Sequence, residues 1–467
     1  MPEIAVSRDR TAAAQEGPLA EPIRTRDDAE AFVAGICFKI GPPRLAGIEL
    51  ERLVYDPTDP TARVPVRRLA SALGRWSPTG LVGTGSHSGL PLPVDPLSVA
   101  STGQPLPAGA AITVEPGGQV ELSTQPWGSI ADCLAAASAD ADAIRAVLAR
   151  AGLAVGHAGI DPFRPAVRMV DKPRYAAMER YFAAAGDAGR LMMASTASVQ
   201  ISVDAGTDGG DHAFAARWHT LHAIGPVLVA LFGNSPVHAG APTGWHSTRQ
   251  RVWIKLDPGR TAPSNIYEGD PRDPYAARAL AAPLLCLPNG TDRWDAPPGV
   301  TFLDWMNGAL DRPATYADLE YHLSTLFPPV RAKGYLEVRY LDAQPGEDWR
   351  VPPAVIWTLL CSPALRDAAL AAVEPVGPPT WPGAWAAAAR DGLTEPGLAT
   401  AARVLMEVAL GGLAEAGLPA PIRRQVTEFA QRYTFRGRSP ADDQLDALAL
   451  GEGLDRTTPD EVQGEKR

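Results

Sequence analysis

Glutamates at alternating positions are the first residues in this sequence whose types and spacing suggest chemistry. Glu49 and Glu51 alternate with the apolar Ile48 and Leu50. Successive side chains of a β-strand point to opposite faces, so a strand at 45–54 would carry both acids on one face and the apolar residues on the other. Two carboxylates held side by side can bind a divalent metal ion.

Three later segments, 113–123, 195–203 and 334–341, repeat this division into an apolar and a polar face. In the first of them, register depends on a kink at Pro116-Gly117-Gly118, where glycine marks a bulge. Four such segments in one chain predict four amphipathic strands of one sheet. Their polar faces carry, in chain order after Glu49 and Glu51, the residues Glu115, Gln119 and Glu121, then Gln200, then Glu337 and Arg339.

If the four strands share a sheet, the acids gather on one face, and their mutual repulsion is unfavourable without cations. Magnesium prefers oxygen ligands and keeps substrate phosphates in its shell, so the pattern indicates a phosphoryl-transfer site. Arg339 on the same face is suited to hold the transferring phosphoryl group. The alternative, for any single strand, is the solvated face of an antiparallel sheet.

The familiar nucleotide and hydrolase motifs are missing. No GxxxxGK[ST] loop occurs, and Gly83-Thr84-Gly85 opens no helix, so neither a P-loop nor a dinucleotide fold is indicated. There is no GxSxG and no HExxH. His219 and His222 share a helix face without a nearby acidic ligand, which is typical of structural histidines.

The elements that would position these residues are strands and helices in mixed order, which predicts an α+β fold. Residues 56–111 are rich in Pro, Gly and Ser and read mostly as loop, and Ser77 to Gly109 is a candidate covering loop, with a floppy surface insertion as the alternative. Helices are expected at 27–37, 66–73, 129–151, 172–185, 212–232, 398–417 and 422–433.

Charge and composition exclude several classes of protein. The net charge is -10 and the pI about 5.4, without a basic run that could follow a phosphate backbone, so no nucleic-acid partner is expected. The longest apolar run, Ile224 to Phe232, is too short to cross a membrane, and the N-terminus lacks a signal-peptide pattern. Four widely spaced cysteines predict reduced thiols. We therefore expect a soluble, cytoplasmic protein with no obligate protein partner.

Five longer strings stand out: GIELE at 47–51, EPGGQVELS at 115–123, MMASTASVQISVD at 192–204, ALFGNSPVHAGAPTGWHSTRQRVW at 230–253 and YHLSTLFPPVRAKGYLEVRYLD at 321–342. In this order, over most of residues 30–355, they resemble the glutamate-cysteine ligases of plants and many bacteria. Among them, the resemblance is strongest to the actinobacterial ligases of ergothioneine biosynthesis. The cysteines do not reproduce the plant regulatory arrangement, so no redox switch is carried over.

The resemblance implies a glutamine synthetase-like catalytic fold, in which a curved, mainly antiparallel sheet forms a cradle with helices outside. Together with the resemblance, the chain divides into a catalytic ligase domain at 27–355 and, by composition and pattern, a disordered arm at 1–26, a helical C-terminal part at 356–450 packed on that domain, and a frayed tail at 451–467. By the same resemblance, the metal-ligand positions are those of Glu49, Glu51, Glu115, Glu121, Gln200 and Glu337.

The remaining site residues are also carried over from the family. Arg249 takes the place of an arginine that grips a carboxylate of the substrate glutamate. Arg339 takes the phosphate-contacting, catalytic place beside Glu337, and Lys333 joins it at the nucleotide. Gln119 and Trp253 shape the glutamate pocket, although Trp253 has the alternative of packing against the strand.

The activity implied is ATP- and Mg²⁺-dependent joining of the side-chain carboxylate of L-glutamate, through γ-glutamyl phosphate, to the amine of L-cysteine. Magnesium is the expected cofactor, and glutamate, cysteine and ATP are the expected small-molecule partners. Three alternatives remain open at this point: a carboxylate-amine ligase of the same fold with another acceptor, a metal-dependent hydrolase, which would turn over without ATP, and a ligase-like scaffold kept for binding.

Overall fold

Six strands form the central sheet of the computed structural model, which describes residues 18–79, 81, 103–184, 186–263 and 269–453. All pairings in this sheet are antiparallel. The strand order is β3-β4-β1-β6-β10-β9. The bounds are Ala46–Arg52 for β1, Ala111–Val114 for β3, Val120–Ser123 for β4, Ser198–Val203 for β6, Val330–Ala332 for β9 and Leu336–Asp342 for β10. The α+β class and the sharing of one sheet by the four amphipathic segments are confirmed.

Two small sheets flank the central one. The first pairs β2, Val54–Tyr55, with β5, Ala154–Val155, and the second pairs β7, Val237–His238, with β8, Ala241–Pro242. Each is a pair of two-residue strands, so neither adds a layer to the fold.

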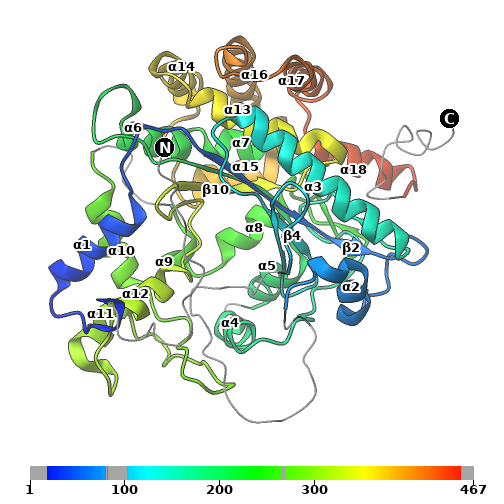
Figure 1. Ribbon diagram of the computed structural model, residues 1–467. Coiled ribbons are helices and arrows are strands. Elements are labelled where there is room, and N and C mark those ends of the chain that lie inside the picture. Colours follow the sequence, from blue (N-terminus) through cyan, green and yellow to red (C-terminus); the bar gives the residue numbers. More distant parts are fainter. Residues whose placement is uncertain (1–17, 80, 82–102, 185, 264–268, 454–467) are drawn as a thin grey trace, which may run out of the picture.

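Helices cover the apolar face of the central sheet. On this face α3 (Ile130–Arg150) packs against β1 and β4, α13 (Val351–Leu359) against β6, and α7 (Gly225–Leu231) against β10. Figure 1 shows α3 crossing the sheet diagonally. The apolar side chains that alternate with the glutamates, such as Ile48 and Leu50, are almost fully buried here.

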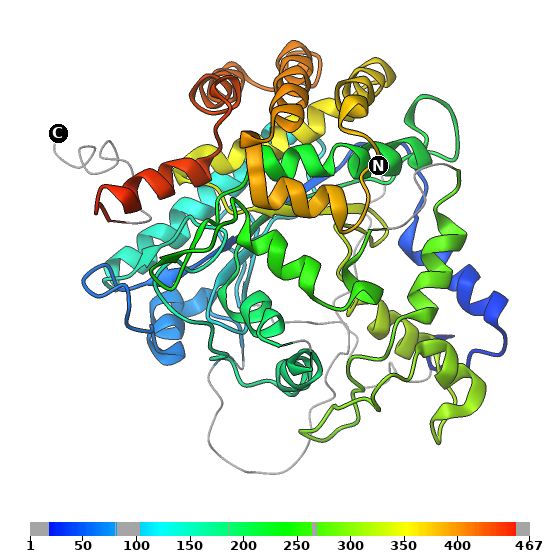
Figure 2. The ribbon, with the colours of Figure 1, turned by 180° about the vertical axis from the view of Figure 1, so that it is seen from behind.

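The opposite face of the sheet lies toward helices from the middle of the chain, which come forward in the view from behind (Figure 2). These helices and the ones beside them carry the side chains that close the polar face. They are α1 (Arg26–Cys37), α4 (Pro173–Ala183), α5 (Ala188–Ser195), α8 (Thr248–Lys255) and α12 (Tyr316–Leu323).

Local sequence explains where several helices begin. Thr25 caps α1 in a capping box with Asp28, as its position before an apolar repeat predicts. Ser129 caps α3 by accepting a hydrogen bond from the Asp132 amide. Further helices of the described chain are α2 at Val66–Leu73, α6 at Phe214–Ala223, α9 at Pro258–Thr261, α10 at Arg272–Ala281 and α11 at Phe302–Asp304.

The last part of the described chain is helical. Helices α14, α16 and α17 form the top of the molecule in Figure 1, with α13 below them. The α16 helix buries Leu398, Ala402, Leu405 and Ala409, which are spaced by three or four residues, against α13 and α14. The bounds are Pro363–Val373 for α14, Gly383–Asp391 for α15, Pro396–Gly412 for α16, Ala420–Arg432 for α17 and Pro440–Ala449 for α18.

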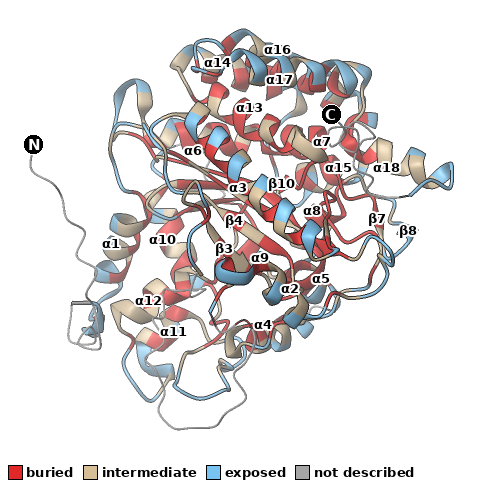
Figure 3. Ribbon diagram, turned by 45° about the vertical axis from the view of Figure 1, so that its right-hand side comes forward, coloured by how far each residue is buried: buried red, intermediate tan, exposed pale blue. Residues whose placement is uncertain are grey.

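Burial follows these layers (Figure 3): the strands and the inner sides of the helices are buried, and exposed residues lie on the outer turns and loops. Among the described residues, no single helix is long and apolar enough to span a membrane; one bent pair, Gly346–Leu359 with Pro363–Val376, passes that test by length and composition alone.

Two predictions of secondary structure are wrong. Residues 113–123 form a hairpin rather than one kinked strand, because Gly118 takes a positive φ of 90° and the chain reverses between β3 and β4. Residues 212–232 form a 3₁₀ turn and two helices, because Gly225 and Pro226 start the separate helix α7.

The remaining parts of the predicted domain division stay predictions. The expected arm at 1–26 lies largely outside the described residues, which begin at residue 18, as does most of the expected tail, because they end at 453. Most of the candidate covering loop, at 80 and 82–102, lies outside them as well.

Candidate functional site

The polar face of the sheet opens onto a cavity of about 580 Å³. Its floor consists of β-strand side chains, and its walls come from the helices that face the sheet. Ten of the residues selected from the sequence line it: Glu49, Glu51, Glu115, Gln119, Glu121, Gln200, Arg249, Trp253, Lys333 and Arg339. The eleventh, Glu337, is fully buried and bonds to Arg339.

Two glutamates face each other across neighbouring strands of this floor. Glu51 of β1 is the direct register partner of Glu121 of β4. Thr113 of β3 donates a hydrogen bond of 2.6 Å to Glu121 Oε1. Burial is the main cause that raises the pKa of both carboxyl groups, and at Glu121 the charge of Glu51 adds to it.

Two further glutamates increase the negative charge of the floor. Burial, together with the charges of Glu121 and Glu337, raises the pKa of Glu49 to about 8. At Glu115, burial and then the charges of Glu121 and Glu51 raise the pKa well above its usual range. Four partly buried carboxyl groups that oppose one another's ionisation form a donor set suited to a cation.

Glu337 is the exception among the acids, because two arginines hold it. Arg331 of β9 donates from Nε to Oε2 at 2.6 Å and from Nη2 to Oε1 at 3.0 Å. Arg339 Nη1 donates to Oε2 at 2.9 Å. Burial alone would raise the pKa of Glu337, but the attraction of Arg331 and Arg339 outweighs it and lowers the pKa below its usual range.

Arg339 also links the two halves of the floor. Its Nη1 donates to Gln200 Oε1 at 2.9 Å, and Gln200 Nε2 donates to Glu51 Oε1 at 3.2 Å. The guanidinium carbon lies 5.9 Å from the ring centre of Trp253, a cation–π distance. The chain of contacts fixes Arg339 over the sheet with its positive charge toward the acids.

Arg249 enters the cavity from the first turn of α8. Its side chain is buried, and Nη2 donates to the Arg339 carbonyl at 2.8 Å. Its Nε and Nη1 are buried without a hydrogen-bond partner among the described residues. Buried donors left unpaired are costly, so these two are suited to an anionic ligand. Trp253 lies one turn later on the same helix and also lines the cavity.

The structure gives Gln119 a supporting position at the cavity wall. Its Nε2 donates to the carbonyls of Thr196 (2.9 Å) and Met193 (3.4 Å), and its Oε1 accepts from the Gly117 amide. These bonds tie the turn between β3 and β4 to the end of α5. Glu115 therefore reaches the cavity from a hairpin turn, and its place on a strand face was predicted wrongly.

Sequence reasoning missed Arg331 and most of the wall. Arg331 is the direct cross-strand partner of Glu337, a relation visible only once the turn at Gly334 is recognised. The wall residues come from helices whose apolar stripes read as core, as Tyr175 and Met178 of α4 do. Other missed lining residues are Lys39, Arg174, Met192, Met193, Ser324 and Phe327.

The acids of the described chain do not form a closed metal-coordination shell. Within the described ranges, no three His, Cys, Asp or Glu side chains are grouped closely enough to hold a metal ion as they stand. Glu337 is instead held by Arg331 and Arg339. The donor set itself, all oxygen and mostly carboxylate, suits magnesium.

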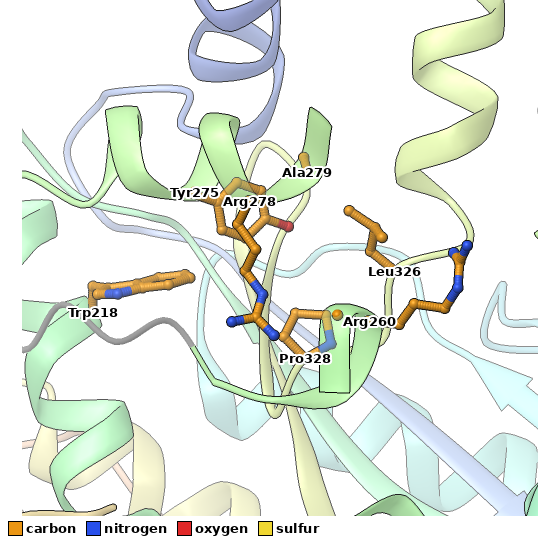
Figure 4. A pocket seen from close by; sticks show the side chains of 8 residues that line it. Trp218, Arg260, Tyr275, Arg278, Ala279, Leu326 and Pro328 are labelled. Atoms are coloured by element: carbon orange, nitrogen blue, oxygen red, sulfur yellow. The ribbon is translucent and has the colours of Figure 1, made fainter. Parts of the chain in front are cut away.

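A second, much smaller cavity lacks the features of a binding site. It encloses only about 10 Å³ among Trp218, Arg260, Tyr275 and Arg278. In Figure 4 the guanidinium groups of Arg260 and Arg278 point away from each other. This hollow has neither the volume nor the convergent charges to bind a substrate.

The chain is similar to known proteins of one family over most of its length. Residues 45–465 match the family described as Glutamate-cysteine ligase family 2 (GCS2). The glutamate–cysteine ligase EgtA of Mycolicibacterium smegmatis is 37% identical over 445 residues, which are 94% of this chain and 95% of that protein. The chloroplastic glutamate–cysteine ligase of Medicago truncatula is 32% identical over 51% of this chain and 47% of its own.

Among solved structures, a glutamate–cysteine ligase from Francisella tularensis in complex with AMP is similar with a TM-score of 0.49. Its sequence identity is 12%, over 88% of this chain and 86% of that chain.

Proposed function

We propose that the carboxylate-lined cavity is the active site of this chain, which belongs to glutamate-cysteine ligase family 2. The protein is accordingly a glutamate–cysteine ligase, an enzyme that joins glutamate to cysteine. In this proposal, the acidic floor binds magnesium, Arg249 binds glutamate, and Arg339 binds ATP together with Lys333. One observation carries this assignment: four partly buried glutamates gather with Arg249 and Arg339 around a single cavity.

The acidic floor fits magnesium on the chemistry of its donors. Glu49, Glu51, Glu115 and Glu121 have raised pKa values because burial and mutual repulsion oppose their ionisation. A hard divalent cation removes that conflict, since it prefers carboxylate oxygens. These four would hold magnesium together with Gln200 and Glu337, and the metal would supply charge neutralisation for the phosphates of ATP.

The substrate side of the proposal rests on the free donors of Arg249. Nε and Nη1 of this buried arginine have no partner among the described residues, so a carboxylate of glutamate can accept from them. The side-chain carboxylate of glutamate is then held toward the acidic floor. Trp253 on the same helix limits the pocket, and Gln119 keeps the Glu115 turn in place.

The chemistry proceeds in two balanced steps. A side-chain carboxylate oxygen of glutamate attacks the terminal phosphorus of ATP, and the bond to ADP breaks, which gives γ-glutamyl phosphate. Arg339 stands where it can stabilise the charge of the transferring phosphoryl group. The amine of cysteine then attacks the acyl carbon and loses a proton, and phosphate leaves with the bridging oxygen.

The proposal also covers the pathway that the product serves and the compartment of the enzyme. The product γ-glutamylcysteine would serve ergothioneine biosynthesis, a role supported by the resemblance to the actinobacterial ligases and by the similarity to EgtA of Mycolicibacterium smegmatis. We place the enzyme in the cytoplasm. Its four cysteines are free thiols, three of them buried, as in proteins of reducing compartments.

A product assay tests the function. Purified protein is incubated with ATP, Mg²⁺, glutamate and one amine at a time, and the products are weighed by mass spectrometry. We expect γ-glutamylcysteine and one phosphate for each peptide bond, with cysteine as the best acceptor. Turnover without ATP would instead identify a hydrolase, and a γ-glutamyl product with another amine but none with cysteine would identify a different acceptor.

A further inference from the structure

A buried carboxylate outside the cavity is connected to the glutamate-binding helix. Asp342, the last residue of β10, is 2% exposed and does not line the cavity. Its Oδ2 accepts from the Asn234 amide at 2.9 Å and from Ser235 Oγ at 2.7 Å. Its Oδ1 accepts from Ser247 Oγ at 2.9 Å. Both oxygens of this carboxylate are therefore used to hold neighbouring chain segments.

The two serines pass this anchorage on to the first turn of α8. Ser247 is the N-cap of α8 and accepts from the Gln250 amide at 3.1 Å. Ser235 Oγ accepts from the amide of Arg249 itself, also at 3.1 Å. Each hydroxyl thus donates its proton to Asp342 and receives a backbone proton of α8. Asp342 reaches the backbone of Arg249 through a single intervening side chain.

Further bonds fasten the same turn to β10. Gln250 Nε2 donates to the Tyr340 carbonyl at 2.8 Å, and Arg249 Nη2 donates to the Arg339 carbonyl at 2.8 Å. The backbone at Gly159 also approaches Asp342 closely, since a Cβ added there would lie 2.7 Å from Asp342 Cβ. Position and orientation of α8 relative to β10 are therefore set at several points around Asp342.

We propose that Asp342 is a positioning residue that, through Ser235 and Ser247, fixes Arg249 at the distance from Arg339 that binding of the substrate carboxylate requires. The inference rests on the proposed function of Arg249. It assigns to a residue beyond the cavity a specific effect on glutamate affinity. The effect is separate from ATP, because Arg339 and Lys333 stay in place on β10 and the adjoining turn without the serine bridge.

The test compares Ser247→Ala with Ser129→Ala. Ser129 caps α3 with the same geometry, since it accepts from the Asp132 amide at 3.1 Å, and it takes no part in the site. Both variants lose an N-cap, but Ser247→Ala also leaves the buried Oδ1 of Asp342 without its hydrogen-bond donor, so it should lose more stability than Ser129→Ala. Only Ser247→Ala should raise the KM for glutamate, by about tenfold, with the KM for ATP and kcat within about twofold of wild type.

Asp342→Asn provides the second variant, because it keeps the side-chain volume but offers only one accepting oxygen. We expect its KM for glutamate to rise, as it should for Ser247→Ala. A general loss of folded enzyme would lower kcat and leave KM unchanged, so the split between the two constants separates positioning from stability. Glutamate-dependent protection against thermal unfolding gives a second readout that needs no turnover.

The possible results separate the positioning role of Asp342 from the ligase function. Wild-type glutamate KM and glutamate protection in folded Ser247→Ala and Asp342→Asn would overturn the positioning role while leaving the ligase function intact. If Asp342→Asn does not fold, Ser247→Ala decides alone. If wild-type protein makes no γ-glutamylcysteine, the proposed function fails, and the protection measurement still decides whether Asp342 governs glutamate binding.

Discussion

Glu51 and Glu121 lie directly opposite each other on β1 and β4, so two carboxylates meet across one pair of strands. Like charges in this position destabilise a strand pair. Burial raises the pKa of both, and the charge of Glu51 raises that of Glu121 further. A sheet that keeps such a pair of carboxylates in a cavity is suited to bind a cation there.

Glu121→Gln should remove metal-dependent activity while leaving the protein folded. The amide has the size of the carboxylate but binds magnesium weakly, so activity at saturating ATP should fall by about 100-fold or more. Without magnesium the variant should be more stable than wild type at pH 9, by about 0.5 kcal/mol, because one of two facing charges is gone. Magnesium titrations of rate and urea unfolding measure both effects.

Glu407→Gln is the matched control, since Glu407 is exposed on α16, far from the cavity in sequence and fold. It should change neither magnesium dependence nor stability. Near wild-type activity of Glu121→Gln and Glu51→Gln would take both residues out of the metal site.

Arg249→Lys should raise the glutamate requirement. Lysine keeps the positive charge but lacks the planar guanidinium, so the KM for glutamate should rise about tenfold with little change in the KM for ATP. Arg251→Lys is the control on the same helix, because Arg251 stacks on Trp245 at 5.6 Å and does not line the cavity. Steady-state rates at varied glutamate decide. An unchanged glutamate dependence of Arg249→Lys would defeat the assigned role.

Gly117→Ala should displace the turn that carries Glu115. A Cβ at this position would lie 2.1 Å from the Ala194 carbonyl oxygen, a backbone atom that cannot give way cheaply. We expect a loss of about 1–3 kcal/mol in unfolding free energy and weaker magnesium dependence. Gly128→Ala, where an added Cβ meets nothing within 4 Å, serves as the control. Equal stability of the two variants would contradict the close packing of the turn.

His246→Gln should destabilise the protein more at pH 6 than at pH 9. His246 Nδ1 lies 3.0 Å from the Arg390 carbonyl, and Nε2 lies 3.5 Å from Asp442 Oδ1. Both neighbours accept protons, so the geometry favours the doubly protonated imidazole. Burial lowers its pKa, but the bonds to Asp442 and Arg390 outweigh burial and raise it above the usual 6.5.

A raised histidine pKa gives stability that is complete below pH 6.5 and is lost as the pH rises through the higher folded value. The pKa of Asp442 is lowered: burial opposes the shift, but its bond to His246 outweighs it, so the pair weakens again in acid below the usual 3.8. The cost of His246→Gln should be about 1 kcal/mol at pH 6 and smaller at pH 9. Urea unfolding at both pH values measures it, and a pH-independent cost would exclude the charged pair.

The sequence predicted the floor of the site better than its walls. Alternation with period two places Glu49 and Glu51 on one face whatever the tertiary structure, and the same holds for Glu337 and Arg339. The hairpin at Pro116-Gly117-Gly118 was missed because glycine is typical of both a bulge and a turn. One reading continues the strand and the other reverses it, and only tertiary contacts decide.

The wall residues are not predictable by periodicity. Met178 and Tyr175 occupy the buried stripe of α4, which has the same pattern whether it faces core or cavity. Arg331 could be paired with Glu337 only after the β9–β10 register was known. Asp342 lies at the end of a strand, and nothing in its spacing indicates the serines that it holds.

The most direct test of the proposed reaction follows the side-chain carboxylate oxygens of glutamate during turnover. Glutamate labelled with ¹⁸O in both side-chain carboxylate oxygens is converted with ATP, Mg²⁺ and cysteine, and the released phosphate is analysed by mass spectrometry. We expect one ¹⁸O in each phosphate, because the bridging oxygen of γ-glutamyl phosphate leaves with it. Phosphate that contains no ¹⁸O would contradict the acyl phosphate and with it the role given to the cavity.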